Sequence, residues 1–332
     1  MKKLINNPSN VVEEMLEGLV SAHSDQLERL EDTHAVHRKQ DDESIVGLVS
    51  GGGSGHEPAH AGFVGDGMLS AAVLGEVFTS PTPDQILEAI KASDHGQGVF
   101  LIVKNYSGDV MNFQLAEELA QMEEITVDHV IVEDDIAIEP LENKNKRRGI
   151  AGTVLMHKIL GYYAREGQSV AELKEIAEHV MSELKTIGLA LTAATVPEVG
   201  KPGFAIADDE FEFGIGIHGE PGYKREKLMS SHDMAKELIH QLKDEFHWQA
   251  GDHYAVLVNG MGSTPQMELY LFWNDIRILL ESEGITVDFV RVEEWMTSID
   301  MAGASLTMLH LDDLDWLTAL NSPVHTIAWN NE

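Results

Sequence analysis

Three short apolar runs in the first half of the chain each lead into a polar loop, and this repeated design most restricts the fold. The runs lie at residues 45–50, 99–104 and 129–133. Stretches with helical spacing of apolar residues separate or follow them, at 83–92, 113–122, 148–165 and 169–187. Such alternation is typical of α/β proteins. In open α/β sheets ligands bind beyond the carboxyl ends of the strands, so we expect the three loops to border a ligand site.

The texture of the sequence changes near residue 188. A strand-like run at 189–195 is followed by a segment rich in glycine and proline at 197–203. Further strand-like runs lie at 211–217, 254–259, 286–292 and 304–309, with helical stretches at 266–283 and 313–320. The length of 332 residues fits two domains. We therefore predict an α/β protein of two domains, 1–187 and 188–332, each a mostly parallel or mixed β-sheet flanked by helices.

The composition excludes several classes of function. Lys and Arg number 23 against 56 Asp and Glu, a formal net charge of −33, which repels nucleic-acid phosphates. The absence of cysteine excludes disulfides, thiolate metal sites and cysteine nucleophiles, and fits a cytoplasmic location. No apolar run approaches the ~20 residues of a membrane helix. The amphipathic stretch at 11–20 does not fit a signal peptide, and no spacing of residues indicates a protein-bound metal.

The loop Gly51-Gly52-Gly53-Ser54-Gly55-His56-Glu57-Pro58 follows the first apolar run. Its glycines let backbone N–H groups approach a small oxygen-rich ligand closely, and His56 could act as a general base. No Gly-Lys-Ser/Thr follows, so this is not a nucleotide P-loop. A third and least favoured hypothesis is a nucleotide-binding oxidoreductase. Pro58 argues against the dinucleotide fingerprint that such an enzyme would need. A purely structural glycine turn remains the alternative.

The second loop is Lys104-Asn105-Tyr106-Ser107-Gly108-Asp109. Lys104 ends an apolar run, and buried lysines are rare unless they are paired. Asp109 could accept a hydrogen bond from a substrate hydroxyl and orient or activate it. The alternative is a helix cap in which Asp109 forms a salt bridge with Lys104.

The third element is Gly214-Ile215-Gly216-Ile217-His218-Gly219-Glu220-Pro221-Gly222, whose glycines leave the imidazole of His218 accessible. Neutral imidazole is a nucleophile. Its adduct with a ketone is a hemiaminal that cannot go on to an imine, because the attacking nitrogen has no second proton to lose. This chemistry selects a ketone over glycerol, while His56 or Asp109 could take the proton of the accepting hydroxyl during phosphoryl transfer. An ordinary turn histidine remains the alternative.

Taken in order along nearly the whole chain, these motifs resemble the K subunit of the dihydroxyacetone kinase family. The resemblance rests on the segments at 50–58, 78–85, 104–110, 147–149, 214–222 and 297–301. It implies a cytoplasmic homodimer in which dihydroxyacetone forms a hemiaminal with His218, and His56 acts with Asp109 in acid–base catalysis. The backbone of Gly53, together with Lys104 and Asp109, would hydrogen-bond the substrate. The other substrate-binding residues that we predict are Ser54, Gly55, His56 and Ser80.

The resemblance also bears on the phosphoryl donor. ATP-dependent members of the family continue into a helical nucleotide-binding domain, whereas this sequence stops at Glu332. We therefore expect no cofactor on this chain and a partner L subunit that carries ADP or ATP with magnesium. An M subunit would recharge that nucleotide from phosphoenolpyruvate through the sugar phosphotransferase proteins. The main alternative is a dihydroxyacetone-sensing paralogue that acts as coactivator of a transcription regulator.

Several other polar residues receive bland interpretations. Asp134 and Asp135 are expected in a solvated acidic turn, and His60 near the glycine loop. We expect His157, His179 and His240 to be surface or packing residues on helices. Residues 144–146 depart from the family pattern and are interpreted as loop variation near a partner surface.

Overall fold

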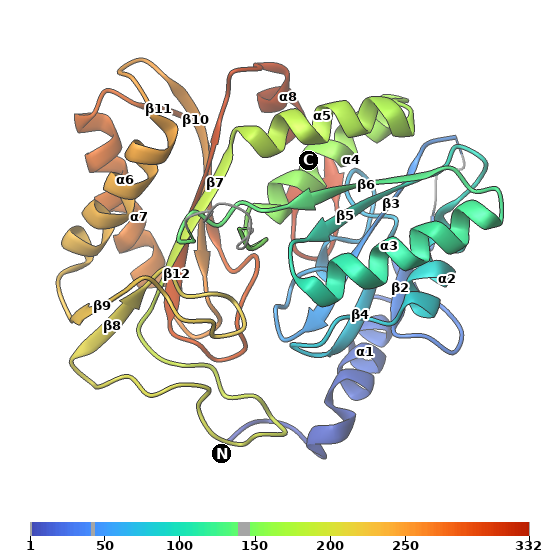
Figure 1. The fold of residues 1–332 in the computed structure, drawn as a ribbon, viewed down its shortest axis with the longest axis horizontal. Coiled ribbons are helices and arrows are strands. Elements are labelled where there is room, and N and C mark those ends of the chain that lie inside the picture. Colours follow the sequence, from blue (N-terminus) through green and yellow to red (C-terminus); the bar gives the residue numbers. More distant parts are fainter. Residues whose placement is uncertain (1, 41–43, 139–146, 332) are drawn as a thin grey trace.

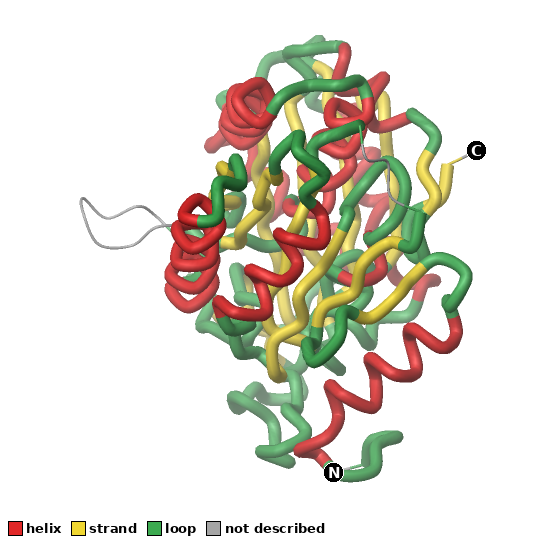
Figure 2. The backbone as a smooth tube through the Cα atoms, turned by 90° about the vertical axis from the view of Figure 1, so that its right-hand side faces the viewer, coloured by secondary structure: helices red, strands yellow, loops and turns green. Residues whose placement is uncertain are grey.

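Two six-stranded β-sheets, with helices packed on their faces, make up the fold (Figure 1). The computed structural model describes residues 2–40, 44–138 and 147–331. The strands run through the middle of the molecule and most helices lie outside them (Figure 2). Both sheets contain parallel and antiparallel pairs, so the predicted fold class is confirmed. None of the helices in the described ranges is long and apolar enough to cross a membrane.

The first sheet has the strand order β1-β2-β4-β3-β5-β6. Its strands β3, β4, β5 and β6 are parallel, and β1 and β2 are antiparallel additions at one edge. The strands are β1 (Leu27–Arg29), β2 (Ala35–Arg38), β3 (Gly47–Ser54), β4 (Ala71–Val77), β5 (Val99–Lys104) and β6 (Val127–Val132). Residues of α2 (Pro83–Ser93) and α3 (Ser107–Met122) bury one face. Those of α1 (Val11–Ala22), α4 (Thr153–Arg165) and α5 (Val170–Ser182) bury the other.

The second sheet has the order β11-β10-β12-β7-β8-β9, in which only β10 and β11 are parallel. The strands are β7 (Leu184–Ala190), β8 (Glu210–Phe213), β9 (Lys224–Lys227), β10 (His253–Gly260), β11 (Thr286–Glu293) and β12 (Gly303–His310). Apolar residues of α6 (Ser231–Phe246) and α7 (Gln266–Ser282) bury one face. The other face shares a core with the first sheet and with α8 (Asp315–Asn321). A short pair, β13 (Val324–His325) and β14 (Asn330–Asn331), closes the chain.

The helix predicted over 169–187 is too long. It begins as expected, with Ser169 and Glu172 forming a capping box, but α5 ends at Ser182. From Leu184 the side chains alternate between two cores, since Leu184 packs in the core shared by both sheets whereas Ile187 packs against α6 and α7. The expected strand at 189–195 therefore begins five residues earlier. The domain boundary at 188 stays a prediction, because β7 spans it.

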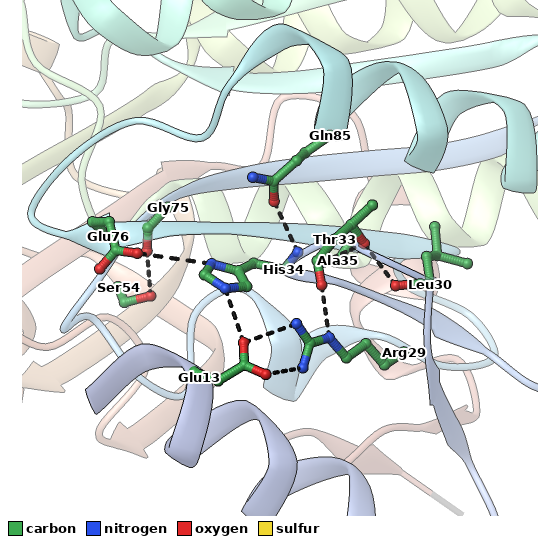
Figure 3. Close-up of polar contacts among 10 residues, drawn as sticks. All are labelled: Glu13, Arg29, Leu30, Thr33, His34, Ala35, Ser54, Gly75, Glu76 and Gln85. Atoms are coloured by element: carbon green, nitrogen blue, oxygen red, sulfur yellow. Dashed lines mark hydrogen bonds and ion pairs between the residues drawn. The ribbon is translucent and has the colours of Figure 1, made fainter. Parts of the chain in front are cut away.

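The edge of the first sheet is fastened to the first helix by a polar cluster (Figure 3). Glu13 of α1 accepts two hydrogen bonds from the guanidinium of Arg29, at 2.6 and 2.8 Å, and also contacts the Nε2 of His34 at 3.0 Å. Close by, the hydroxyl of Ser54 at the end of β3 donates to the carbonyl oxygen of Gly75 at 2.7 Å. The Glu13 contacts join α1 to the edge of the sheet, and the Ser54 contact joins the glycine-rich end of β3 to β4.

The amine of Lys158 on α4 is buried, and its hydrogen-bond partners in the described part of the chain are a carbonyl and a hydroxyl oxygen. It donates to the carbonyl oxygen of Ala319 and, at 2.6 Å, to the hydroxyl of Ser322 beyond α8. Burial, aided by the positive charges of Arg165 and Arg291, lowers the pKa of Lys158 to about 7. The lysine therefore joins two helices mainly in its neutral form at alkaline pH.

This arrangement predicts a pH-dependent contribution to stability. Between pH 7 and 9 the unfolded chain holds a proton on Lys158 that the folded chain gives up, so folding is favoured as the pH rises. We expect the wild type to gain about 2 kcal/mol relative to Lys158→Met over this interval. Urea unfolding at both pH values measures the difference. The same comparison with Lys236→Met, on the exposed side of α6, should show no change, and a constant difference for Lys158→Met would contradict the prediction.

Candidate active site

Residues from both sheets meet at the carboxyl ends of β3 and β5. Gly51 to Ser54 belong to β3 itself, and Lys104 is the last residue of β5. Asp109 lies in the first turn of α3, directly after β5. The loop that follows β8 in the second sheet brings His218 to the same place. The expected position of the site at this edge of the sheet therefore agrees with the structure.

Three aromatic rings hold the imidazole of His218 from the side. Its ring centroid lies 4.5 Å from Tyr106, 4.7 Å from His56 and 5.2 Å from Phe78. All three pairs are edge-to-face, which is a favoured geometry for ring contacts. The side chain of His218 keeps 20% of its surface exposed, so the ring is oriented and still accessible.

Glu220 is the polar partner of His218. Its Oε1 lies 2.9 Å from the Nδ1 of His218, and its Oε2 accepts the backbone N–H of His218 at 3.0 Å. Burial alone would raise the pKa of Glu220, but the hydrogen bond and charge of His218, with the charge of Arg148, lower it to about 2. The side chain is therefore a carboxylate at neutral pH, and a carboxylate can only accept. In the neutral imidazole, Nδ1 then carries the proton and Nε2 keeps the lone pair.

His56 is fully buried and neutral. Burial lowers its pKa well below the usual range, and the charges of Lys104 and His218 lower it further. Its Nδ1 lies 2.7 Å from the carbonyl oxygen of Thr297, so Nδ1 donates and Nε2 is free to accept. No described residue bonds to this Nε2. The geometry is that of a neutral base with its acceptor nitrogen unused.

Lys104 is a buried cation that lacks an acceptor among the described residues. Burial lowers its pKa, while the negative charge of Asp109, only 3% exposed, acts in the opposite direction. Both groups crowd against Gly52: a Cβ there would lie 3.0 Å from the Nζ of Lys104 and 3.5 Å from the Oδ2 of Asp109. A larger residue at this position would press on the end of the Lys104 side chain. No salt bridge joins Lys104 to Asp109 in the described part of the chain, so the amine is available to a ligand.

The remaining predicted substrate residues surround this cluster. Gly53 lies against the backbone of Phe78 and Thr79, and Gly55 against the ring of Phe78. The hydroxyl of Ser80 adjoins Gly108 in the first turn of α3. Ser54 lies between Gly53 and Gly55 in the sequence, but its hydroxyl already donates a hydrogen bond to the carbonyl oxygen of Gly75. The structure thus gathers all the predicted site residues, and their roles toward a substrate stay predictions.

Comparison with known proteins identifies the family. The profile of the Dak1 domain matches residues 17–328 of the chain. The chain belongs to the Dak1 family. The resemblance to the dihydroxyacetone kinase K subunit is thereby confirmed.

The Dak1 relatives include proteins with two different kinds of name. A Lactococcus lactis protein named as the dihydroxyacetone-binding subunit DhaK of a PTS-dependent dihydroxyacetone kinase is 58% identical, over 99% of each chain. The DhaKLM operon coactivator DhaQ of the same organism is 45% identical, over 98% of this chain and 100% of its own. Among solved structures, a dihydroxyacetone kinase operon co-activator has a TM-score of 0.92 at 44% identity, covering 96% of this chain and 98% of its own. The native dihydroxyacetone kinase of C. freundii has a TM-score of 0.89 at 34% identity, with 99% of this chain and 60% of that chain covered.

One interpretation of the sequence, a solvated turn at Asp134 and Asp135, is wrong. Asp134 and Asp135 are not solvated but 0% and 1% exposed. Asp134 accepts the backbone N–H groups of Ile150 and Gly152, and Asp135 pairs with Arg148, so both acids organise the turn after β6. Burial raises the pKa of Asp135 to about 6, although Arg148 opposes the shift.

The histidines outside the site fall into two groups. His60 and His157 are buried in contact with each other, with 3.0 Å between His60 Nδ1 and His157 Nε2, so both belong to the core beneath the glycine loop. The side chains of His179 and His240 are 48% and 62% exposed, as surface residues. Residues 144–146 lie outside the described residues.

One group of side chains in the described ranges has spacing suitable for a metal: Glu117, Asp128 and His129. It lies on α3 and at the amino end of β6, whereas the candidate site lies at the carboxyl ends of the parallel strands. Its members already pair with each other and with Lys174, which lies 3.5 Å from Asp128. The group is explained by these ion pairs, and the expectation of no metal stays untested.

Four residues that build the site were not predicted from the sequence: Phe78, Tyr106, Arg148 and Glu220. Each lies inside a motif that carried the family resemblance. Nothing in their spacing distinguishes them from packing residues or surface charges. Only the fold brings them beside His218.

Proposed function

We propose that this chain is the dihydroxyacetone-binding subunit of a phosphoenolpyruvate-dependent dihydroxyacetone kinase, and that it holds the ketone as a hemiaminal on His218. One observation carries the proposal. The imidazole of His218 has its Nδ1 engaged by Glu220, beside two buried polar atoms that lack partners among the described residues, Nζ of Lys104 and Nε2 of His56. A small ketone with two hydroxyl groups matches one nucleophile and two vacant polar partners. The name of the 58% identical relative supports the same substrate.

The first chemical step is addition to the carbonyl group. The lone pair on Nε2 of His218 forms a bond to the carbonyl carbon, and the π electrons move to oxygen. The oxygen then gains a proton, and the imidazolium gives up the proton on Nδ1, so the product is a neutral hemiaminal. A ring nitrogen bonded in this way has no hydrogen to eliminate with water. The adduct is therefore reversible and leaves both substrate hydroxyl groups free.

The second step divides labour between this chain and a partner. Lys104 and the backbone at Gly53 would hold the hydroxyl groups, and Asp109 with neutral His56 would take the proton of the one that attacks phosphorus. The nucleotide and its magnesium would belong to an L subunit docked over the site, with an M subunit recharging the nucleotide. This chain then contributes positioning and proton transfer, while the partner contributes the phosphoryl group.

A coupled assay for dihydroxyacetone phosphate tests the proposal. The chain is combined with L and M subunits of a phosphotransferase-dependent kinase and with the phosphoenolpyruvate-driven proteins, and omission of the chain is the control. Sustained turnover is expected. Covalent capture of the ketone without turnover would instead favour the second candidate, a sensing coactivator, which the 45% identical coactivator relative brings forward. If the chain showed no covalent capture and no turnover, both candidate functions would be refuted.

We also propose that the chain forms a homodimer through α7 and β11. Exposed apolar side chains form one face there: Met267, Tyr270, Leu271 and Ile278 on α7, with Val290 on β11. β11 is the edge strand of the second sheet, so one side of its backbone is open to pairing with a second copy. β8 and β9, next to His218, lie at the other edge of that sheet. A phosphoryl-donating subunit must reach His218, so a second copy fits this far face better.

Charges introduced into this face should dissociate the dimer. We expect the wild type to have twice the 36.6 kDa chain mass in light scattering, and the double variant Tyr270→Glu/Leu271→Glu to have the mass of one chain. Burial of two carboxylates against apolar surface is strongly unfavourable. The matched control is Leu115→Glu, since Leu115 on α3 is 45% exposed, against 54% for both Tyr270 and Leu271, and its helix packs on the other sheet. A monomeric wild type, or a dimer that survives the double variant, would contradict this interface.

A further inference from the structure

We infer that Glu220 is a positioning residue that fixes the reactive tautomer of His218, and that the buried pair of Arg148 and Asp135 holds the loop carrying both. The inference rests on the proposed hemiaminal chemistry and adds the part of the molecule that makes His218 a nucleophile. None of these three residues is among the predicted site residues.

The contact between Glu220 and His218 uses both carboxylate oxygens. Oε1 accepts the Nδ1 proton and Oε2 accepts the backbone N–H of the same residue, so one side chain satisfies two donors two positions away. Gly216 makes this arrangement sterically feasible, since a Cβ at that position would lie 2.0 Å from Oε2 of Glu220 and 2.6 Å from Nη1 of Arg148. The glycines of this loop therefore serve the carboxylate as much as the imidazole.

Arg148 connects the two sheets beneath this loop. It follows β6 of the first sheet, and its Nη2 donates to the carbonyl oxygen of Gly214, after β8 of the second, at 2.8 Å. Its Nε donates to Oδ2 of Asp135 at 2.7 Å, with both side chains less than 10% exposed. Asp134 in turn accepts two backbone N–H groups of the turn after Arg148, at Ile150 and Gly152. The guanidinium therefore bonds to Asp135 on one side and to the backbone of the loop that carries His218 on the other.

This network suits the charge changes of ketone addition. When Nε2 attacks, the imidazole becomes an imidazolium, and a carboxylate already bonded to Nδ1 stabilises that positive charge and can receive its proton. A histidine oriented by a carboxylate through its other nitrogen is the arrangement that catalytic triads use. A loop held only for its shape would not require an ionised partner on Nδ1. The tautomer therefore separates a chemical role of Glu220 from a structural one.

The test replaces the carboxylate with an amide of the same shape, Glu220→Gln. Glutamine has one acceptor oxygen for two donors, so if its oxygen keeps the backbone N–H of His218, its NH₂ group must face Nδ1. Nδ1 would then accept, and the proton would move to Nε2, where it blocks attack. Nitrogen-15 NMR of the His218 ring, recorded without ketone, reads the tautomer, and titration with dihydroxyacetone followed by native intact-mass measurement reads the adduct.

We expect the wild type to carry its proton on Nδ1. In Glu220→Gln the proton should move to Nε2, and the adduct equilibrium constant should fall at least ~10-fold, the effect of a differential interaction of about 1.4 kcal/mol. The matched control is Glu212→Gln. Glu212 on β8 anchors the same loop by accepting the backbone N–H of Gly222 at 2.6 Å, and its other side-chain partner is Arg225 and not His218. It should leave the tautomer unchanged.

Four results are informative. A wild-type His218 protonated on Nε2, or an unchanged tautomer and adduct in Glu220→Gln, would overturn the inference. An equal loss of adduct in Glu212→Gln and Glu220→Gln, with no tautomer change in either, would reduce Glu220 to a loop support and overturn it too. The expected tautomers in a wild type that forms no adduct would support the positioning role and refute the proposed hemiaminal.

Discussion

His218→Ala should abolish covalent capture of dihydroxyacetone and lower turnover in the reconstituted system by at least ~10³-fold. Alanine removes the nucleophile. The nearest other imidazole, His56, has its ring centroid 4.7 Å away and is fully buried, and in the proposed function its free Nε2 serves proton transfer. Native intact-mass measurement with ketone gives the capture, and the coupled assay gives the turnover.

His240→Ala is the control for this experiment, because His240 lies on α6 with 62% of its side chain exposed. It should keep both capture and turnover. Retention of the covalent adduct in His218→Ala would mean that another group carries the ketone. Retention of near-normal turnover without any adduct would show that the hemiaminal is dispensable for phosphoryl transfer.

Asp109→Asn should separate capture from turnover. Asparagine has nearly the shape of aspartate but cannot take a proton, so the adduct on His218 should survive while kcat falls by ~10²- to 10⁴-fold, the usual contribution of a general base. Asp109 is 3% exposed beside the equally buried Lys104. Loss of its charge also leaves that cation less compensated, so a lower melting temperature is expected as well.

A first-turn carboxylate elsewhere provides the matched control for Asp109. Asp84 has the equivalent place in α2, is exposed, and lies outside the site. Asp84→Asn should preserve capture, kcat and the pH profile. If Asp109→Asn lost the adduct and kept the kcat of the remaining bound fraction, Asp109 would be a binding residue without a role in proton transfer.

Much of the fold was predictable because several of its strands are apolar. The run at 99–104 coincides with β5, and the polar segments at the ends of β3 and β5 do converge with His218. Strands with few strong strand-forming residues escaped: β1 reads Leu-Glu-Arg, and β4 contains two alanines and a glycine, which are depleted in strands. The helix α6 was not predicted, although its sequence contains a helical signal. Its buried apolar residues follow helical spacing: Met234, Ala235, Leu238, Ile239 and Leu242.

The electrostatic support of the site was not predictable in the same way. Asp134 and Asp135 look like a solvated turn because two adjacent acids usually are solvated, and only the turn after β6 supplies the donors that allow their burial. The partnership of Arg148 with the loop after β8 joins residues 66 positions apart in the chain. Spacing within one segment carries no information about such a pair. Of these residues only Arg148 lies in a family motif, and the fold explains the contacts of all three.

The division of the site between two sheets has a mechanical consequence. His218 comes from the second sheet, while Lys104 and Asp109 come from the first. In the proposed function, a ketone bonded covalently to His218 and hydrogen-bonded to Lys104 and Asp109 would link the two sheets. Its binding free energy then adds to the resistance of the whole chain to being pulled apart, because it is lost on unfolding.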